Sequence, residues 1–166
     1  MTSPTDLRDD FDADFERLRH AQDPDEQRRA LRSVLETLYA LRAYREGDNK
    51  IDKATYHNRA DASREGQVTE GVILIRGELL HRAVKRHAPE EKLLYPSETT
   101  YPGNWTFPGS NLVWLHPAEM VDPLRQKILN DGRYPFYVAH VAGQPVLGTL
   151  QIARDFLVND PVLGPL

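Results

Sequence analysis

The residues of this 166-residue chain best suited to chemistry are an arginine and a histidine in its most apolar segment. Arg76 and His81 lie within VTEGVILIRGELLHRAVKRH, residues 68–87, where burying either side chain is costly unless it has a partner or a use. Histidine exchanges protons near neutral pH, and arginine stabilises negative charge through forked hydrogen bonds. Together they fit acid–base chemistry at a phosphate, a reaction that needs no metal or other cofactor.

A single helix is expected to position both residues. The apolar spacing predicts a helix from about Ser63 to His87, which must end by residue 88 because Pro89 disfavours helical geometry in the residue before it. At about 100° per residue, Arg76 and His81 lie roughly 140° apart around this helix. They therefore do not sit side by side, and they would reach one substrate atom only by converging across a groove.

The expected helix has two apolar faces. Its core stripe consists of Val68, Val72, Ile75 and Leu79, and its second apolar patch consists of Ile73, Leu80 and Val84. The patch is centred about 130° from the stripe, with Arg76 and His81 at its two margins. Either the helix is central in a bundle, or the patch meets a second copy of the chain. A homodimer through this helix would bring Arg76 and His81 of both copies into a shared cleft.

Three basic residues follow on the same segment, namely Arg82, Lys85 and Arg86. Positive side chains bind RNA by neutralising its phosphates, so these three are candidate RNA-binding residues. The alternative is a solvated helix face, which is the usual role of a charge run. The formal net charge of -4 argues against a general nucleic-acid binder and confines any RNA contact to a local patch.

The segment RGELLH, residues 76–81, resembles the short motif of the HEPN superfamily, in which a histidine follows an arginine after four to six residues. These helical-bundle proteins include toxin and phage-defence ribonucleases whose active cleft forms by dimerisation. The resemblance implies a metal-independent endoribonuclease or toxin-type effector, with His81 as general acid or base and Arg76 stabilising the phosphorane. Gly77 stands where the family usually has a polar residue.

A non-catalytic helical scaffold or protein-binding module is the alternative interpretation. In it, Arg76 pairs with Glu78, Glu70 or a carboxylate of the first helix, and His81 is an interfacial histidine. The aromatic segment that contains Trp105 and Phe107 would then either cover the core or recognise a protein partner.

The rest of the chain predicts a mainly α fold, a bundle of about four main helices. Capping signals at Ser3-Pro4 and at Asp23-Pro24 start two helices, the second ending before residue 47, and the short link between them favours an antiparallel hairpin. Residues 47–62 are expected to form a loop, with at most the start of the third helix near its end. A last helix opens at Gln144-Pro145. We expect one domain over residues 1–166.

A proline- and aromatic-rich insertion is predicted over residues 89–142. It should carry short strands at 112–115 and 136–141 that pair with each other, and a brief helix from Asp122-Pro123 to Leu129. Gly132 is expected to end that helix in left-handed geometry.

Several classes of site are excluded or not expected. The chain has no cysteine, which excludes disulfides, thiolate zinc sites and a cysteine nucleophile. His81 and His87 lie about 120° apart on a helix, and His116 with Glu119 is a lone pair, so no metal site is expected. The acidic N-terminal segment is no signal peptide and no apolar run could cross a membrane, so we expect a cytoplasmic protein.

Overall fold

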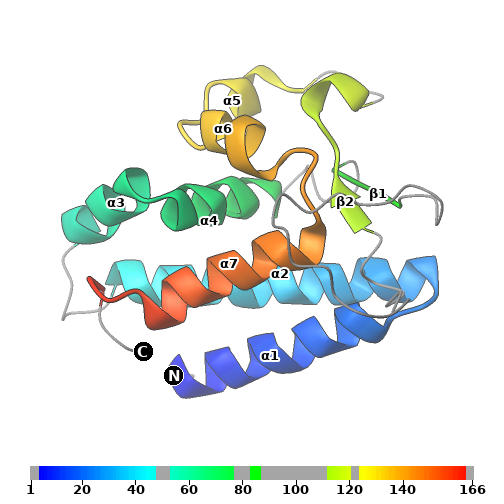
Figure 1. The fold of residues 1–166 in the computed structure, drawn as a ribbon, viewed down its shortest axis with the longest axis horizontal. Coiled ribbons are helices and arrows are strands. Elements are labelled where there is room, and N and C mark those ends of the chain that lie inside the picture. The colour runs from blue at the N-terminus through cyan, green and yellow to red at the C-terminus, as the bar shows by residue number, and fades with distance from the viewer. Residues whose placement is uncertain (1–3, 48–52, 77–82, 87–111, 121–123, 164–166) are drawn as a thin grey trace, which may run out of the picture.

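The computed structural model describes residues 4–47, 53–76, 83–86, 112–120 and 124–163 of the chain. Within these ranges the protein is mostly helical, with one small antiparallel sheet before the last helix. The mainly α fold class and the strand-containing insertion are therefore confirmed. Figure 1 shows the long helices in tiers with nearly parallel axes, and the short elements gathered beside one end of the fourth helix.

Helices α1 (Pro4–His20) and α2 (Pro24–Gly47) form the predicted antiparallel hairpin (Figure 1). The carboxylate of Asp23 accepts hydrogen bonds from the backbone N–H groups of Asp25 and Glu26 at 2.9 and 3.0 Å, and thus caps α2. The buried face of α2 contains Leu31, Val34, Leu35, Leu38 and Leu41. Local capping signals and a regular apolar stripe were enough to predict this pair.

The expectation of a loop over residues 47–62 is wrong for its second half, which forms α3 (Lys53–Ala62). Only Tyr56 and Ala60 of α3 are buried, which is too few for a periodic apolar signal. Packing stabilises the helix instead: a Cβ on Gly66 of the next helix would lie 2.4 Å from Ala60 Cα. The glycine is therefore required for the close approach of the two helices.

Helix α4 (Arg64–Ile75) begins where the sequence predicts, because the Ser63 hydroxyl accepts a hydrogen bond from the Gly66 N–H at 3.1 Å. It ends at Ile75, and residues 84–86 form a strand, so the prediction of one helix over 63–87 is wrong. Arg76 is the C-cap, and its N–H donates to the carbonyl of Ile73 at 3.3 Å. Glycine is the residue that most often follows a helix, and Gly77 was an available signal for this end.

Downstream of α4 the chain forms strand β1 (Val84–Arg86), which pairs antiparallel with β2 (Leu112–Trp114). Val84 lies opposite Trp114, and Arg86 lies opposite Leu112. Apolar spacing does not separate a short buried strand from a helical segment. The strand at 112–114 is therefore predicted correctly, but its partner is not the one expected.

The residues of the second apolar patch do not share one helix in the structure. Ile73, one member of the second apolar patch, is buried within the single chain, and Val84 belongs to a strand. Leu79, Leu80 and His81 lie outside the described residues. The two-faced helix on which the dimer expectation was based is therefore not present, although the homodimer itself stays a prediction.

The expected strand at 136–141 is also wrong, because these residues form α6 (Tyr134–Phe136) and one π-helical turn, η3 (Tyr137–Val141). The apolar run packs against α4 at Gly71. A Cβ on Gly71 would lie 2.9 Å from Val141 Cγ2 and 3.1 Å from Tyr137 Cα. Tertiary packing against a glycine thus overrides the strand propensity of this segment.

The rest of the insertion is described in part. Residues 117–119 form the 3-10 turn η2 (Pro117–Glu119), and the brief helix is α5 (Gln126–Leu129), which begins later than expected. Among the described residues, positive φ occurs at Gly143, with φ 78°, and not at Gly132, so the left-handed geometry expected there is wrong.

The core is completed by α7 (Val146–Asn159), which begins next to the predicted Pro145. Trp114 is fully buried and its indole N–H donates to the Thr149 hydroxyl at 2.6 Å, which joins β2 to α7. The buried guanidinium of Arg45 donates to the carbonyls of Leu157, Val158 and Leu163, which satisfies the end of α7. None of the described helices is long and apolar enough to cross a membrane.

Candidate functional site

Helices α2 and α4 run antiparallel (Figure 1) and are joined by two Glu–Arg ion pairs. In one pair α2 supplies the glutamate, and in the other it supplies the arginine. Glu36 of α2 pairs with Arg76, and Arg42 of α2 pairs with Glu70 of α4. Both helices contain the pattern Glu, five residues, Arg, in ETLYALR at 36–42 and in EGVILIR at 70–76. Each glutamate thus meets the arginine of the other helix, and the two pairs together specify the register of the two helices.

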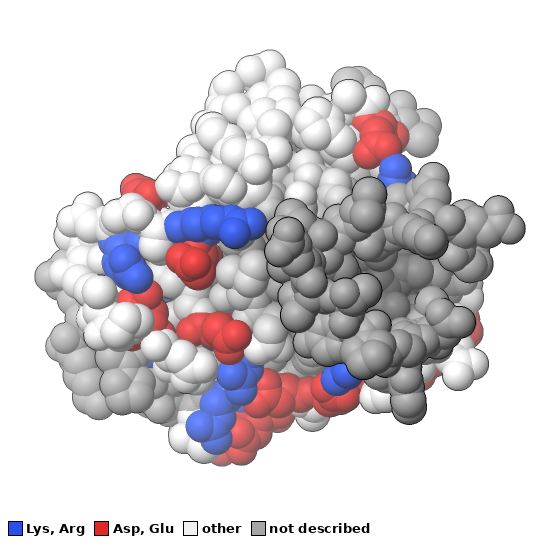
Figure 2. Space-filling model, viewed as in Figure 1, with Lys and Arg blue, Asp and Glu red and all other residues white. Residues whose placement is uncertain are grey.

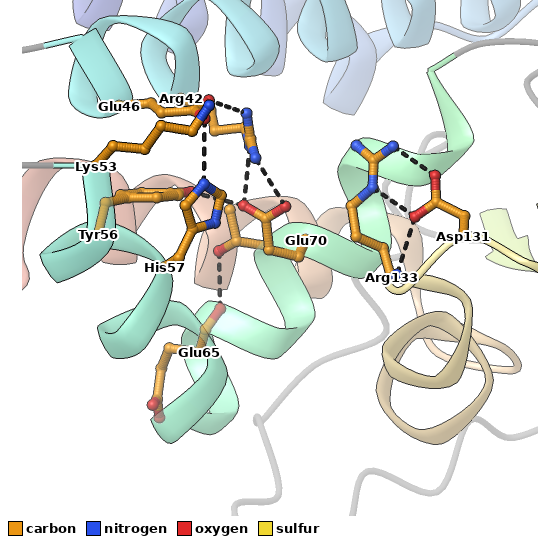
Figure 3. Close-up of polar contacts among 10 residues, drawn as sticks. Arg42, Glu46, Lys53, Tyr56, His57, Glu65, Glu70, Asp131 and Arg133 are labelled. Atoms are coloured by element: carbon orange, nitrogen blue, oxygen red, sulfur yellow. Dashed lines mark hydrogen bonds and ion pairs between the residues drawn. The ribbon is translucent and has the colours of Figure 1, made fainter.

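The Arg42–Glu70 pair is the buried one. Arg42 Nε donates to Glu70 Oε1 at 2.9 Å and Nη2 donates to Oε2 at 3.2 Å, while the Tyr56 hydroxyl donates to Oε1 at 2.8 Å (Figure 3). The side chains of Arg42 and Glu70 are 12% and 5% exposed. Burial would lower the pKa of Arg42, but the hydrogen bond and charge of Glu70 outweigh it and raise that pKa. Burial, reinforced by Glu70, raises the pKa of Tyr56.

Glu46 forms the outer edge of this buried cluster (Figure 3). Its carboxylate accepts from Lys53 Nζ at 2.7 Å and lies 3.1 Å from His57 Nε2, and it also pairs with Arg42. The Lys53 hydrogen bond opposes the effect of burial. Together with the charge of Arg42 and the hydrogen bond from His57, it lowers the pKa of Glu46 to about 2. The cluster joins α2, α3 and α4, which is a structural role.

Arg133 lies on the other side of Glu70 in Figure 3, on the loop before α6. Its Nε and Nη2 donate to the two carboxylate oxygens of Asp131 at 2.9 and 2.7 Å. This bidentate pair raises the pKa of Arg133, against the effect of its burial, and fixes the turn that precedes α6.

The Glu36–Arg76 pair is the accessible one. Arg76 Nε donates to Glu36 Oε2 at 2.8 Å, and Nη2 lies 2.6 Å from the same oxygen. The guanidinium also lies over the ring of Tyr39, 3.7 Å from its centroid. The side chains of Arg76 and Glu36 are 33% and 46% exposed. The Glu36 hydrogen bond raises the pKa of Arg76, so the site holds a permanent cation, oriented from one side, at the solvent edge of the helix pair.

The other residues singled out from the sequence are not brought to this site by the described part of the chain. His81 and Arg82 lie outside the described residues, and so do Trp105 and Phe107. Lys85 is on β1, where its Nζ lies 2.6 Å from Glu119 Oε1. Arg86 ends the same strand. The prediction that Lys85 and Arg86 lie on a basic face of a helix is therefore wrong, because both residues are in a strand.

Surface charge is mixed on the face of the molecule that Figure 2 shows. Figure 2 shows Lys and Arg next to Asp and Glu on the face seen in Figure 1, without a broad area of one sign among the coloured residues. No group of three or more His, Asp or Glu side chains that could hold a metal ion occurs among the described residues. His116 and Glu119 do meet, as the capping box of η2.

Four residues of these contacts were not predicted from the sequence, namely Glu36, Tyr39, Arg42 and Tyr56. The partner of Arg76 among the described residues, Glu36, also differs from the partners expected. Glu70, one expected partner, is taken by Arg42 instead. The available signal was the repeated Glu-x5-Arg pattern in two predicted helices. Two such patterns on antiparallel helices allow two reciprocal ion pairs, but only the fold shows that both form.

Comparisons with known proteins do not identify the chain: no protein-family model matches it, and neither the curated proteins nor the solved structures give a match.

Proposed function

We propose that this protein is a metal-independent endoribonuclease in which Arg76 binds the scissile phosphate. The observation that carries the proposal is the state of the Arg76 guanidinium, which is oriented by Glu36 and Tyr39 and yet remains one-third exposed. A guanidinium held in one orientation loses little freedom when it binds a phosphate, and its forked donors match the phosphate oxygens. The side chain stays charged at every physiological pH.

His81 is the proposed acid–base partner, and this assignment rests on the segment RGELLH and its resemblance to the HEPN motif. In such a reaction a ribose 2′-oxygen attacks phosphorus, the 5′-oxygen leaves, and one histidine takes or gives the proton. The products are a 2′,3′-cyclic phosphate and a 5′-hydroxyl. The proposal extends to a homodimer and to a cytoplasmic toxin or defence effector, with Arg82, Lys85 and Arg86 as RNA contacts.

A non-catalytic scaffold or protein-binding module is the second candidate, and one observation favours it. Two of the candidate basic residues, Arg76 and Lys85, have described side chains, and each has an acidic partner. Arg76 pairs with Glu36, and Lys85 pairs with Glu119. Paired charges of this kind also occur where a protein only needs to hold its elements together.

The deciding experiment incubates the purified chain with a labelled random-sequence RNA pool in the presence of a chelator. Arg76→Ala and His81→Ala are the test variants. Arg28→Ala is the matched control, because it removes an exposed arginine of α2 that pairs only with Asp25 among the described ion pairs. We expect the wild type and the control to cleave equally, and Arg76→Ala to be slower by about 10²–10³-fold.

Three results would contradict the ribonuclease. They are no cleavage by the wild type, equal cleavage by Arg76→Ala, or cleavage that the chelator abolishes. Analytical ultracentrifugation of the same samples measures the oligomeric state, and a monomer that cleaves RNA would refute the shared dimer cleft alone.

A further inference from the structure

We infer that Glu36 is the general base of the proposed ribonuclease, accepting the proton of the ribose 2′-hydroxyl on its Oε1 atom. This inference rests on the proposed function and adds to it a residue from a different helix. It follows from comparing the two Glu–Arg pairs between α2 and α4, which have the same chemistry and different surroundings.

The buried carboxylate is engaged at both of its oxygens. Glu70 Oε1 accepts from Arg42 and from Tyr56, and Oε2 accepts from the second arm of Arg42. With its side chain 5% exposed, Glu70 is satisfied and closed to a ligand. This is the arrangement expected of a carboxylate that only stabilises the fold.

The accessible carboxylate differs at one oxygen. Glu36 Oε2 receives both contacts from Arg76, at 2.8 and 2.6 Å, whereas Oε1 has no hydrogen bond to any residue in the described part of the chain. Its side chain is 46% exposed. An acceptor oxygen thus stands beside a fixed guanidinium, and both are open to solvent.

A ribose and its 3′-phosphate fit this pair of groups in charge and donor pattern. The 2′-hydroxyl is a hydrogen-bond donor, so it would face Oε1 of Glu36. The adjacent phosphate is an anion, so it would face the guanidinium of Arg76. A guanidinium has five N–H donors, and Glu36 engages only those of Nε and Nη2, which leaves donors for a phosphate. Tyr39 supports the guanidinium from its ring face.

The proposed step is balanced in atoms and charge. Glu36 takes the proton from the 2′-hydroxyl as the 2′-oxygen forms its bond to phosphorus. The bond between phosphorus and the 5′-oxygen then breaks, and a separate acid, for which His81 is the candidate, gives that oxygen a proton. Water later returns the proton of Glu36 to solvent and restores the carboxylate.

The test measures single-turnover cleavage of the RNA pool and, separately, the Kd for a 2′-O-methyl RNA that cannot be cleaved. Glu36→Gln keeps an acceptor for Arg76 but loses the base, so we expect a rate loss of about 10²–10⁴-fold with Kd unchanged. Glu36→Asp keeps the carboxylate and should recover part of the rate. Asp25→Asn is the matched control, since it removes an exposed carboxylate of α2 whose side chain is 70% exposed.

A sulfur-substituted RNA distinguishes the base from the acid. In this RNA, sulfur replaces the 5′-bridging oxygen at the mapped cleavage site, and sulfur leaves without needing a proton. A variant that lacks the base should therefore stay slow on this RNA, whereas a variant that lacks the acid should recover its rate. The expected result is an undiminished loss in Glu36→Gln and a reduced loss in His81→Ala.

The outcomes separate this inference from the proposed function. If Arg76→Ala is slow while Glu36→Gln cleaves as fast as the wild type, the ribonuclease stands and the base assignment is overturned. It is also overturned if Glu36→Gln weakens binding as much as it slows cleavage, or if the sulfur substrate restores its rate. No cleavage by the wild type refutes both.

Discussion

The two Glu–Arg pairs allow the same substitution to be made in two environments within one protein. Arg42→Met and Arg76→Met each remove one guanidinium from a Glu–Arg pair and retain an apolar side chain of similar reach. The first leaves Glu70 buried without its bidentate partner, and the second leaves Glu36 at the surface. Stability should therefore respond very differently to the two changes.

The magnitudes follow from the exposure of the partner that remains. Removing one member of a buried ion pair costs about 3–5 kcal/mol, because the uncompensated charge stays desolvated. Glu70 would keep only the Tyr56 hydrogen bond, so we expect Arg42→Met to lie in that range. An exposed ion pair contributes about 0–1 kcal/mol and an exposed cation–π contact about 0.5–1 kcal/mol. Arg76→Met should therefore lower the free energy of unfolding by about 0.5–2 kcal/mol.

Urea denaturation at pH 7, followed by helical circular dichroism, measures both values if the transitions are two-state. A double variant, Arg42→Met with Glu70→Met, provides an internal control because it removes both buried charges. Its loss should be smaller than the sum of the two single losses by about 1–3 kcal/mol. The reasoning is refuted if Arg42→Met costs less than 1 kcal/mol, if Arg76→Met costs as much, or if the double variant is additive.

Three further predictions concern stability. Because the pKa of Glu46 is about 2 in the folded chain against 4.5 for the ordinary group, its contribution is complete above pH 4.5 and is lost as the pH falls toward 2. The unfolding free energies of wild type and Glu46→Gln should thus differ by about 1–3 kcal/mol at pH 7 and converge near pH 2, and a constant gap would contradict this. Gly71→Ala should lower the melting temperature, because the new Cβ would clash with η3 and cost about 1–3 kcal/mol of unfolding free energy. Its control is Gly148→Ala, whose Cβ would have nothing within 4 Å, and which should stabilise the fold by about 0.5–1 kcal/mol. Thr149→Val should cost about 1–3 kcal/mol in urea denaturation by leaving the buried Trp114 N–H without its acceptor, and an unchanged midpoint would contradict that bond.

The starts of the main helices were predictable because their signals are local. Asp23 and Ser63 cap the helices that follow them, and Pro145 precedes the last helix. A capping side chain bonds to backbone groups two or three residues away, so the sequence alone carries the information. The mainly α class follows from these starts and from the apolar stripes between them.

The wrong predictions share a different cause. Residues 84–86 form a strand because they pair with 112–114, and residues 136–141 form helical turns because they pack against Gly71. α3 forms with almost no apolar stripe of its own. In each case the partner is distant in the sequence or lacks a side chain, and local periodicity contains no trace of it.

The candidate site divides in the same way. The sequence by itself determined that an arginine, Arg76, follows a strongly apolar run, and that the pattern Glu-x5-Arg occurs twice. Only the tertiary structure decided that Arg76 meets Glu36, forty positions earlier, and that one Glu–Arg pair is sealed by Tyr56 while the other stays open. The reason is physical: the strength and the accessibility of an ion pair depend on the solvent around it, and burial is a property of the packed helices rather than of the pattern along one of them.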